Sequence, residues 1–505
     1  LLGSEEEMRR WGAARGARVV ELDGRALLPG FIDAHGHFPG AGIYDVWTDL
    51  NSPPIGPVEN IAGLVERLAE KAAETASGDW VVGLGYDDTL LAEGRHPNRS
   101  DLDLVSSEHP VAALHVSGHL AAVNGRALEA LGFGPDSPDP PGGHLRRDTS
   151  GALDGVLEES AMEGLSLEVT PGLVDGLRVL RSANERYLAA GVTTAQSGAT
   201  PPGVLRLLRW ASRLGVIPLR LVIWPDREAA DALIADGASF ASLGGRRARV
   251  GAVKLIADGS IQGYTGYLSQ PYFVPPGDDP SYRGYPRLQR EELIRLVTGY
   301  HEAGLQVAVH GNGDASIDDI LDALEEAQRL HPRADARPVV IHAQMARDDQ
   351  LDRMAALGAI PSFFSLHTFY WGDRHRRIFM GPERAARMSP AATAAAKGVR
   401  YTIHCDAPVV PMEPLRLVWA AVHRRTRSGF VVGEAERVPV EQALRAVTLD
   451  AAFQHFEEAE RGSLAPGKLA DLVILSRSPL DDPETLDEIE VLETIIGGRS
   501  EWQQH

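Results

Sequence analysis

Cysteine and lysine are scarce in this 505-residue chain. The single cysteine, Cys405, rules out an intrachain disulfide and a zinc site built from several cysteines. Lysine occurs only at positions 71, 254, 397 and 468, so arginine supplies most of the positive charge and each lysine deserves an explanation. No apolar run approaches the ~20 residues that a membrane-spanning helix needs, so we expect no membrane partner.

Positive charge as a whole is also in deficit. The chain has 50 Lys and Arg against 70 Asp and Glu, a net charge of −20. Such a surface repels phosphate backbones, so nucleic acid is not an expected partner. The single cysteine suits the reducing cytoplasm, which we take as the expected compartment; because the chain starts at Leu1, an upstream signal peptide stays open. A homodimer is one option for its assembly.

The length exceeds that of a single hydrophobic core, so two or more units are expected. Short apolar runs at 17–22, 469–475 and 491–496 predict that the two chain ends pair into one small β domain, formed by residues 1–30 and 463–505. The middle of the chain, residues 31–462, is then a single long insert between the two ends.

The middle alternates β-branched runs with amphipathic helices, which is typical of parallel β/α units. Eight strands of this kind fit a closed (β/α)8 barrel in the α/β class. The predicted strands are Phe31–His35, Val192–Ser197, Pro218–Trp224, Gly251–Ala257, Gln306–His310, Pro338–His342, Ala359–Phe363 and Arg400–Asp406.

One interval of about 150 residues separates the first two predicted strands and is far longer than a βα loop needs. It contains an amphipathic segment, Ile61–Ala76, and two strand-like runs, Trp80–Tyr86 and Val111–Val116. We therefore expect residues 38–190 to form an inserted subdomain over one rim of the barrel, where it shapes the substrate pocket.

Two histidines spaced i, i+2 close the first apolar run, which reads LPGFIDAHGH over residues 28–37. On an extended strand, His35 and His37 point to the same face and can hold one cation, because neutral imidazole is the commonest metal ligand. A bare H-x-H more often just ends a strand. The preceding residues and the residues far downstream favour the metal interpretation here.

Barrel active sites are assembled at the C-terminal ends of the strands. Residues that can bind or adapt to a metal follow predicted strands one, four, five, six and eight: His35, His37, Lys254, His310, His342 and Asp406. Histidine and carboxylate suit a zinc-like ion. Four imidazoles and one carboxylate suffice for two ions if a further group bridges them.

Lys254 is the unusual member of this set, because cations repel an ammonium group. Burial and nearby positive charge lower the pKa of a lysine, and the neutral amine can capture carbon dioxide as a carbamate with one oxygen for each ion. The alternative interpretation is a plain ion pair between Lys254 and Asp258.

Several longer motifs surround these residues. They are PGFIDAHGH (29–37), GGH (142–144) through GALDG (151–155), VKLIADGS (253–260), VHGNGD (309–314), VIH (340–342), DAPV (406–409) and GSLAPGKLADLV (462–473). Together they resemble the amidohydrolase superfamily, in particular the branch of YtcJ-like and N-substituted formamide deformylase-like proteins, over nearly the whole chain.

This resemblance implies a TIM-like barrel with a β-sandwich built from both chain ends, and a metal centre. It assigns His35, His37 and Asp406 to one ion, His310 and His342 to the other, and a carboxylated Lys254 to the bridge between them. Two divalent ions, most simply zinc, are expected, with a single ion as the variant that occurs in the family.

The sequence departs from the family pattern directly before Asp406. His404 and Cys405 stand where small residues are expected. On a strand, His404 shares a face with Asp406 and is a candidate for a supporting role at the centre or for an extra ligand. Cys405 faces away and is expected to be structural.

The expected reaction is hydrolysis of a C–N bond in an amide or N-substituted formamide. The attacking nucleophile is a hydroxide activated by metal, and Asp406 serves as general base and then general acid. Two alternatives stay open: a mononuclear deaminase of a heterocycle, which Lys254 disfavours, and a non-catalytic binding protein on the same barrel. Candidate contacts to a small amide-type substrate are Tyr86, His119, His367 and Trp371.

Overall fold

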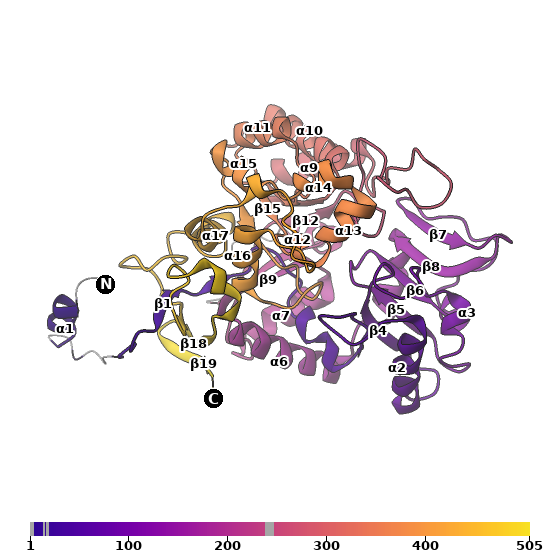
Figure 1. Ribbon diagram of the computed structural model, residues 1–505, viewed down its shortest axis with the longest axis horizontal. Coiled ribbons are helices and arrows are strands. Elements are labelled where there is room, and N and C mark those ends of the chain that lie inside the picture. Colours follow the sequence, from indigo (N-terminus) through magenta and orange to yellow (C-terminus); the bar gives the residue numbers. More distant parts are fainter. Residues whose placement is uncertain (1–4, 14–15, 17–19, 238–246, 505) are drawn as a thin grey trace.

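The computed structural model describes residues 5–13, 16, 20–237 and 247–504. Two parallel sheets form its centre (Figure 1). The first has the order β11-β10-β9-β2 and the second the order β12-β13-β14-β15-β16. Their strands are β2 (Phe31–Ile32), β9 (Val192–Thr200), β10 (Arg220–Pro225), β11 (Ala248–Val250), β12 (Val253–Ile256), β13 (Val307–Gly311), β14 (Val339–His342), β15 (Ile360–Phe363) and β16 (Thr402–Ile403).

Backbone hydrogen bonds continue past the assigned strands at the margins of both sheets. Gly251 directly follows β11 and continues its pairing with β10 by donating its N–H to the Ile223 carbonyl over 2.8 Å; β12 begins two residues later, so the chain passes there directly from the first sheet into the second. Beyond β2, the His37 N–H donates to the Ala407 carbonyl, which follows β16, over 2.9 Å. The two sheets are therefore neighbours at both margins.

The first and last predicted strands are shorter than expected. The run predicted as Phe31–His35 is paired only over β2, and the run predicted as Arg400–Asp406 only over β16. Asp406 has φ of 54°, in the left-handed region, so the chain has left the extended conformation there. The functional side chains at these two ends therefore belong to loops.

Helices connect the parallel strands, as the alternating pattern predicts. The main ones are α6 (Leu173–Ala189), α7 (Pro202–Arg213), α8 (Arg227–Ala235), α9 (Arg290–Glu302), α10 (Asp314–Leu330), α11 (Asp348–Leu357), α15 (Ala391–Ala396), α16 (Pro414–His423), α17 (Val440–Ala446) and α18 (Leu449–Gln454). In α10 the buried residues Ile317, Ile320, Leu321 and Leu324 recur at helical spacing and pack on the central core. Gly358 ends α11 at φ of 61°, a conformation that glycine adopts without steric cost.

The chain between β2 and β9 forms a separate sheet, which we call the insertion sheet (purple to magenta in Figure 1). Its order is β3-β4-β5-β6-β8-β7, and it carries its own apolar core around Leu50, Leu64, Leu68 and Val111. The elements are β3 (Thr48–Asp49), α2 (Ile61–Glu74), β4 (Val81–Tyr86), α3 (Arg99–Leu102), β5 (Val111–His115), β6 (Leu120–Val123), α4 (Gly125–Ala130), β7 (Gly143–Arg147), β8 (Leu153–Glu159) and α5 (Glu163–Glu168). The helix and both strands predicted in this interval occur within a few residues of their expected bounds.

The two chain ends pair in one antiparallel sheet of the order β1-β17-β18-β19, in which Ala26 lies opposite Leu475. Its strands are β1 (Ala26–Pro29), β17 (Leu472–Leu475), β18 (Val491–Ile496) and β19 (Arg499–Gln503). Among the described residues this is a single sheet, and no second layer of the expected β-sandwich is assigned. The strand predicted over 17–22 falls partly outside the described residues, and 20–22 are irregular.

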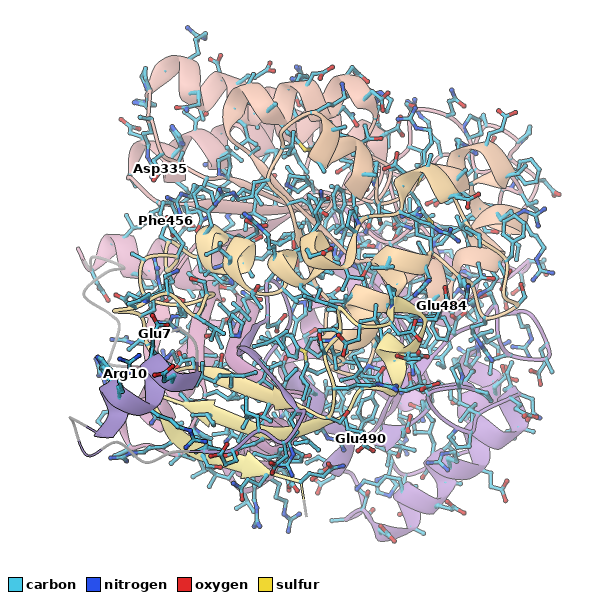
Figure 2. All side chains as sticks on the ribbon, turned by 60° about the vertical axis from the view of Figure 1, so that its left-hand side comes forward. Glu7, Arg10, Asp335, Phe456, Glu484 and Glu490 are labelled. Carbon is cyan, nitrogen blue, oxygen red and sulfur yellow. The ribbon has the colours of Figure 1, made fainter. Side chains whose placement is uncertain are left out.

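A buried ion pair attaches this end sheet to the parallel part. The Arg220 guanidinium, on β10, donates to both carboxylate oxygens of Asp471, and its Nη2–Oδ1 distance is 2.9 Å. Glu484 and Glu490, in the segment between β17 and β18, are exposed acidic residues (Figure 2). No helix among the described residues is long and apolar enough to cross a membrane.

The remaining short helices are α1 (Glu5–Ala13), α12 (His367–Tyr370), α13 (Gly372–Arg374) and α14 (Gly381–Ala386). The last three follow β15, and the segment between Phe364 and Phe379 is largely buried. This segment therefore covers the part of the second sheet that carries His342.

Candidate metal centre

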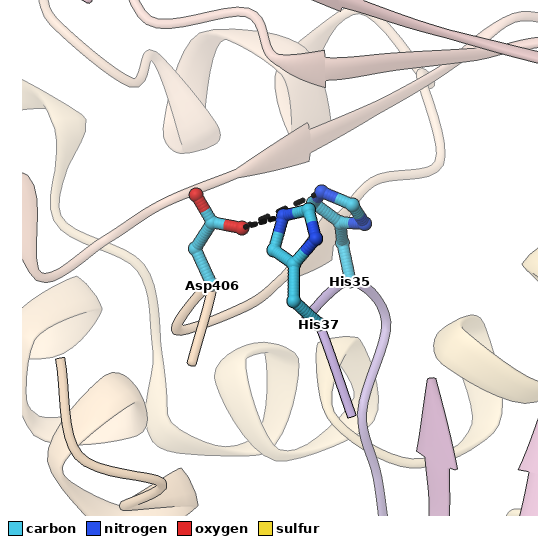
Figure 3. Close-up of side chains that lie close together, drawn as sticks. All are labelled: His35, His37 and Asp406. Carbon is cyan, nitrogen blue, oxygen red and sulfur yellow. Dashed lines mark ion pairs between the residues drawn. The ribbon is translucent and has the colours of Figure 1, made fainter. Parts of the chain in front are cut away.

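The loop after β16 brings Asp406 against the two histidines in the loop after β2 (Figure 3). The Oδ1 atom of Asp406 lies 3.4 Å from His35 Nε2 and 3.3 Å from His37 Nε2. This oxygen is buried and has no hydrogen-bond partner. A buried carboxylate oxygen without a donor is costly unless something positive completes it. The same set of atoms is compact enough to hold one ion.

The outer nitrogens of both histidines are held by oxygen acceptors. His35 Nδ1 donates to Gln196 Oε1 over 3.0 Å, and His37 Nδ1 donates to the Gly198 carbonyl over 3.1 Å. The Nε2 atoms that face Asp406 therefore carry a lone pair instead of a proton, the state a metal ligand needs. Gly198 is required for this packing, because a Cβ there would lie 2.5 Å from His35 Cε1.

His310 and His342 form a second pair beside the first. His310 Nδ1 lies 3.1 Å from His342 Nε2, and His342 Nε2 lies 3.8 Å from Asp406 Oδ2. His310 donates its other nitrogen, Nε2, to the Gly259 carbonyl over 3.0 Å. Asp406 thus lies between two pairs of imidazoles, with one carboxylate oxygen near each pair.

Lys254, on β12, contacts the first pair and lines the same cavity as the second. Its Nζ lies 3.0 Å from His35 Nε2, and it forms no ion pair among the described residues. Burial lowers the pKa of Lys254 to about 7. The alternative partner, Asp258, instead accepts hydrogen bonds from the backbone N–H groups of Tyr267, Asn312 and Gly313. The ion pair between Lys254 and Asp258, which was the alternative to a bridging lysine, is therefore not formed.

Electrostatics keep these groups in ligand-competent forms. Burial lowers the pKa of His35, His310 and His342 well below the ordinary histidine value, so the rings are neutral. Burial alone would raise the pKa of Asp406, but its close contacts with His37, His342 and His35 bring the pKa well below its ordinary value. Neutral imidazoles around an ionised carboxylate are what a divalent cation binds.

Two of these residues have strained backbones. His342 has φ of 68° and Asp406 has φ of 54°. Left-handed conformations of non-glycine residues cost free energy and are retained where the surrounding structure needs a particular side-chain direction. Here these backbone conformations direct the side chains of His342 and Asp406 toward the metal centre.

A cavity of about 240 Å³ opens onto this point. Its lining combines the centre with the insertion sheet: His37, Lys254, His310, His342 and Asp406 on one side, and Leu84, Val116, Ser117, Gly118 and His119 on the other. The insertion sheet therefore contributes directly to the space in which a small molecule would meet the centre.

Comparison with known proteins agrees with this arrangement. The sequence profile of the amidohydrolase family matches residues 18–500. The chain belongs to the amidohydrolase family. This membership confirms the resemblance drawn from the motifs.

Relatives of the amidohydrolase match it over nearly their full length. An N-substituted formamide deformylase of Arthrobacter pascens is 28% identical, with 99% of this chain and 92% of the relative covered. YtcJ of Bacillus subtilis is also 28% identical, with 98% and 93% covered. A solved metal-dependent hydrolase from Pyrococcus furiosus superposes with a TM-score of 0.73 at 28% identity, covering 95% of this chain and 93% of that one.

The four predicted substrate contacts of this chain lie in different places. His119 lines the cavity, and its ring centre is 4.9 Å from that of His310. His367 is buried 6.1 Å from the His342 ring. Tyr86 and Trp371 are buried away from the cavity lining, where Tyr86 contacts His96 and Trp371 donates to Asp87.

Some residues around the centre gave no signal in the sequence. Gln196 lies inside a predicted strand and holds both His35 and the Gly36 N–H. Glu159 ends β8 and accepts the His119 Nδ1–H over 2.9 Å. Their roles depend on distant partners, so no local pattern indicates them. His404, which the sequence did flag, packs directly against His342.

Proposed function

We propose that this amidohydrolase is a metal-dependent hydrolase that cleaves a C–N bond in an amide-type small molecule. The observation that carries the proposal is the orientation of the imidazoles. His35, His37 and His310 each donate one N–H outward to an oxygen and turn the other nitrogen inward, beside an Asp406 oxygen that lacks any donor. This donor set fits a divalent metal centre.

In the architecture we propose, the two parallel sheets are halves of one barrel, which has eight strands when β11 and β12 are counted as one interrupted strand. The short step from β11 to β12 at one margin and the bond from His37 to Ala407 at the other support this. The proposed domains are the barrel over 31–462, with 38–190 as its inserted pocket subdomain, and an end domain of 1–30 and 463–505.

Two ions fit the residues present, and zinc is the metal we propose. His35, His37 and Asp406 would hold one, and His310 and His342 the other. Lys254 would bridge them as a carbamate: the neutral Nζ adds to the carbon of carbon dioxide, an N–C bond forms, and one proton is released. Support comes from the burial of Nζ without a carboxylate partner.

When bound, divalent ions supply Lewis acidity and make water nucleophilic near neutral pH. Asp406 supplies the proton transfers. Its carboxylate takes a proton from the attacking water and delivers it to the leaving nitrogen, so that an amide and water become a carboxylic acid and an amine.

His119 is the substrate contact that the cavity supports best. Glu159, which is fully buried, accepts the Nδ1–H of His119, and the Glu159 backbone N–H donates to the His119 carbonyl over 2.9 Å. This two-point attachment leaves His119 Nε2 available to the cavity. We propose that it bonds the polar group next to the scissile bond. The named deformylase relative makes N-substituted formamides the first substrates to consider.

One preparation tests the proposal. Metal content is measured together with hydrolysis of a panel of N-formyl and N-acyl amines. We expect about two metal equivalents per chain and release of amine that stops when a chelator removes the metal. One equivalent with deamination of a heterocycle would favour the mononuclear alternative, and no metal with no turnover would favour a binding protein.

A further inference from the structure

A line of buried polar side chains runs from His342 into the centre of the second sheet. His342 Nδ1 lies 3.2 Å from His404 Nε2, and His404 Nδ1 lies 2.9 Å from Ser362 Oγ. Ser362 Oγ lies 2.8 Å from Thr402 Oγ1, which donates to Gln454 Oε1 over 2.7 Å. All five residues are buried, so these groups depend on each other for hydrogen bonds.

The proton positions along this line follow from the metal centre. His342 Nε2 is the nitrogen that faces His310 and Asp406, so it is the one that can bind a cation. An imidazole that binds through Nε2 keeps its proton on Nδ1 and donates it outward. The acceptor at that position is His404 Nε2. His404 must then carry its own proton on Nδ1 and donate it to Ser362 Oγ.

His342 differs in this respect from the other three imidazoles of the centre. His35, His37 and His310 donate to oxygen atoms, one from an amide side chain and two from the backbone. His342 has an imidazole nitrogen in that place. This gives a physical reason for a histidine at 404, where the family pattern has small residues.

We propose that His404 is a positioning residue, which accepts the Nδ1–H of His342 and so fixes the tautomer and ring direction that present Nε2 to a cation. The inference rests on the proposed function, because it requires the metal centre. Gln454 also donates to the Ala34 carbonyl over 2.7 Å, beside His35. The line therefore ties the His342 side of the centre to the His35 side.

His404 could alternatively be an additional ligand, since one of its nitrogens lies within 4.8 Å of a ligand atom of His342 and one of Asp406. The observed bonds speak against this. Both ring nitrogens of His404 are already engaged, one by His342 and one by Ser362. None is left for a cation.

Two substitutions at 404 separate these roles. In His404→Gln the side-chain oxygen can accept the His342 Nδ1–H and the amide N–H can donate to Ser362, whereas His404→Leu fills similar space and can do neither. Cobalt(II) affinity of the chelator-stripped full chain is measured by competition with a chelator, and the visible spectrum reports the coordination. In the Leu variant we expect the cobalt(II) affinity of the more weakly binding of the two metal sites to fall about 10–100-fold. In the Gln variant it should stay within about threefold of the wild type.

The outcomes are distinct. Unchanged cobalt affinity and spectrum in the Leu variant would overturn the inference. Loss of a whole cobalt equivalent in both variants would also overturn it, because His404 would then be a ligand. If the Leu variant does not fold by circular dichroism, Ser362→Ala replaces it; a loss of about threefold or more supports the inference, and unchanged affinity contradicts it. A wild type that binds no cobalt would instead refute the metal centre itself.

Discussion

Two buried groups of histidine and aspartate in this molecule have similar composition and different surroundings. One is the metal centre around Asp406. The other, which we call the insertion cluster, comprises Asp87, Asp88, His96 and His115 under the insertion sheet, and three of its members are also close enough together to hold an ion.

In the insertion cluster, positive charge is already present. Asp87 accepts from Arg374 over 2.7 Å, from Trp371 over 2.9 Å and from Thr89. Asp88 lies 3.2 Å from His115 Nε2 and 3.6 Å from His96 Nε2. A cation there would meet the Arg374 guanidinium. Buried ligand atoms without a hydrogen-bond partner occur in both groups: Asp406 Oδ1 at the metal centre, and Asp88 Oδ1 and His115 Nε2 in the insertion cluster. The metal centre differs because a cavity gives access to it and no guanidinium among the described residues contacts Asp406. Residue types and unpartnered atoms alone therefore do not identify a metal site; local charge and access also decide.

The largest expected effect comes from Asp406→Asn. We predict a loss of about 10²–10⁴-fold in kcat, because the amide cannot carry the proton, while most of the bound metal stays. Steady-state kinetics and metal analysis on the same sample provide the measurement. The matched control is Asp88→Asn in the insertion cluster, for which metal content should not change. Wild-type kcat in Asp406→Asn would refute the proton-transfer role.

Lys254→Met tests the bridge. Metal content should fall from about two equivalents to at most one, and activity should fall by at least about 10²-fold, because Lewis-acid polarisation contributes several kcal/mol. Lys397→Met is the control, since Lys397 forms a surface ion pair with Asp352 at 2.6 Å. Two equivalents retained in Lys254→Met would show that the bridge is not needed.

Asp87→Asn should leave metal content unchanged and destabilise the fold by about 3–5 kcal/mol, because it leaves Arg374 buried without its charge partner. Urea unfolding measures this, with the exposed pair of Arg178 and Asp175 as control: Asp175→Asn should cost under about 1 kcal/mol. Equal effects of the two substitutions would mean that the insertion cluster is not a structural ion pair.

The same variant has a defined pH dependence. Burial alone would raise the pKa of Asp87, but Arg374 and the neighbouring donors bring it well below its ordinary 3.8. For an acid with a lowered pKa, the stabilisation is complete above the unfolded value and is lost as pH falls through the lower folded value. The stability difference between wild type and Asp87→Asn should therefore be constant from pH 7 to pH 5 and shrink only below about 3.8.

The smallest effect is expected for Cys405→Ala. Cys405 is buried next to Asp406 in sequence, but its Sγ lies 3.4 Å from Met412 Sδ, away from the centre. We predict unchanged metal content and a loss of about 1 kcal/mol in unfolding free energy from lost packing. Loss of metal in this variant would place the thiol in the centre.

The parallel strands could be predicted because buried strands read as continuous β-branched runs, as in Val339–Ile341 within β14. The convergence of histidines could be predicted because such strands end at one rim. The single end sheet could not be separated from a sandwich, because short apolar runs do not reveal how many layers they form.

Hydrogen-bond partners that depend on strand register could not be predicted from the sequence. Ser362 lies opposite Thr402 in the pairing of β15 with β16, and this register brings His404 to Ser362. Glu159 reaches His119 across the insertion sheet in the same way. A single sequence fixes spacing within a strand but not the offset between strands, so these contacts appear only in three dimensions.

The pairing of Ala26 with Leu475 has a consequence for synthesis on the ribosome. β1 emerges early, but its hydrogen-bonding partner β17 is translated about 450 residues later. At 5–20 residues per second, β1 waits on the order of 20–90 s with an open edge. The end sheet is therefore the last part of the fold to form in a newly made chain. A truncation before β17 leaves β1 with unpaired backbone groups that chaperones can bind.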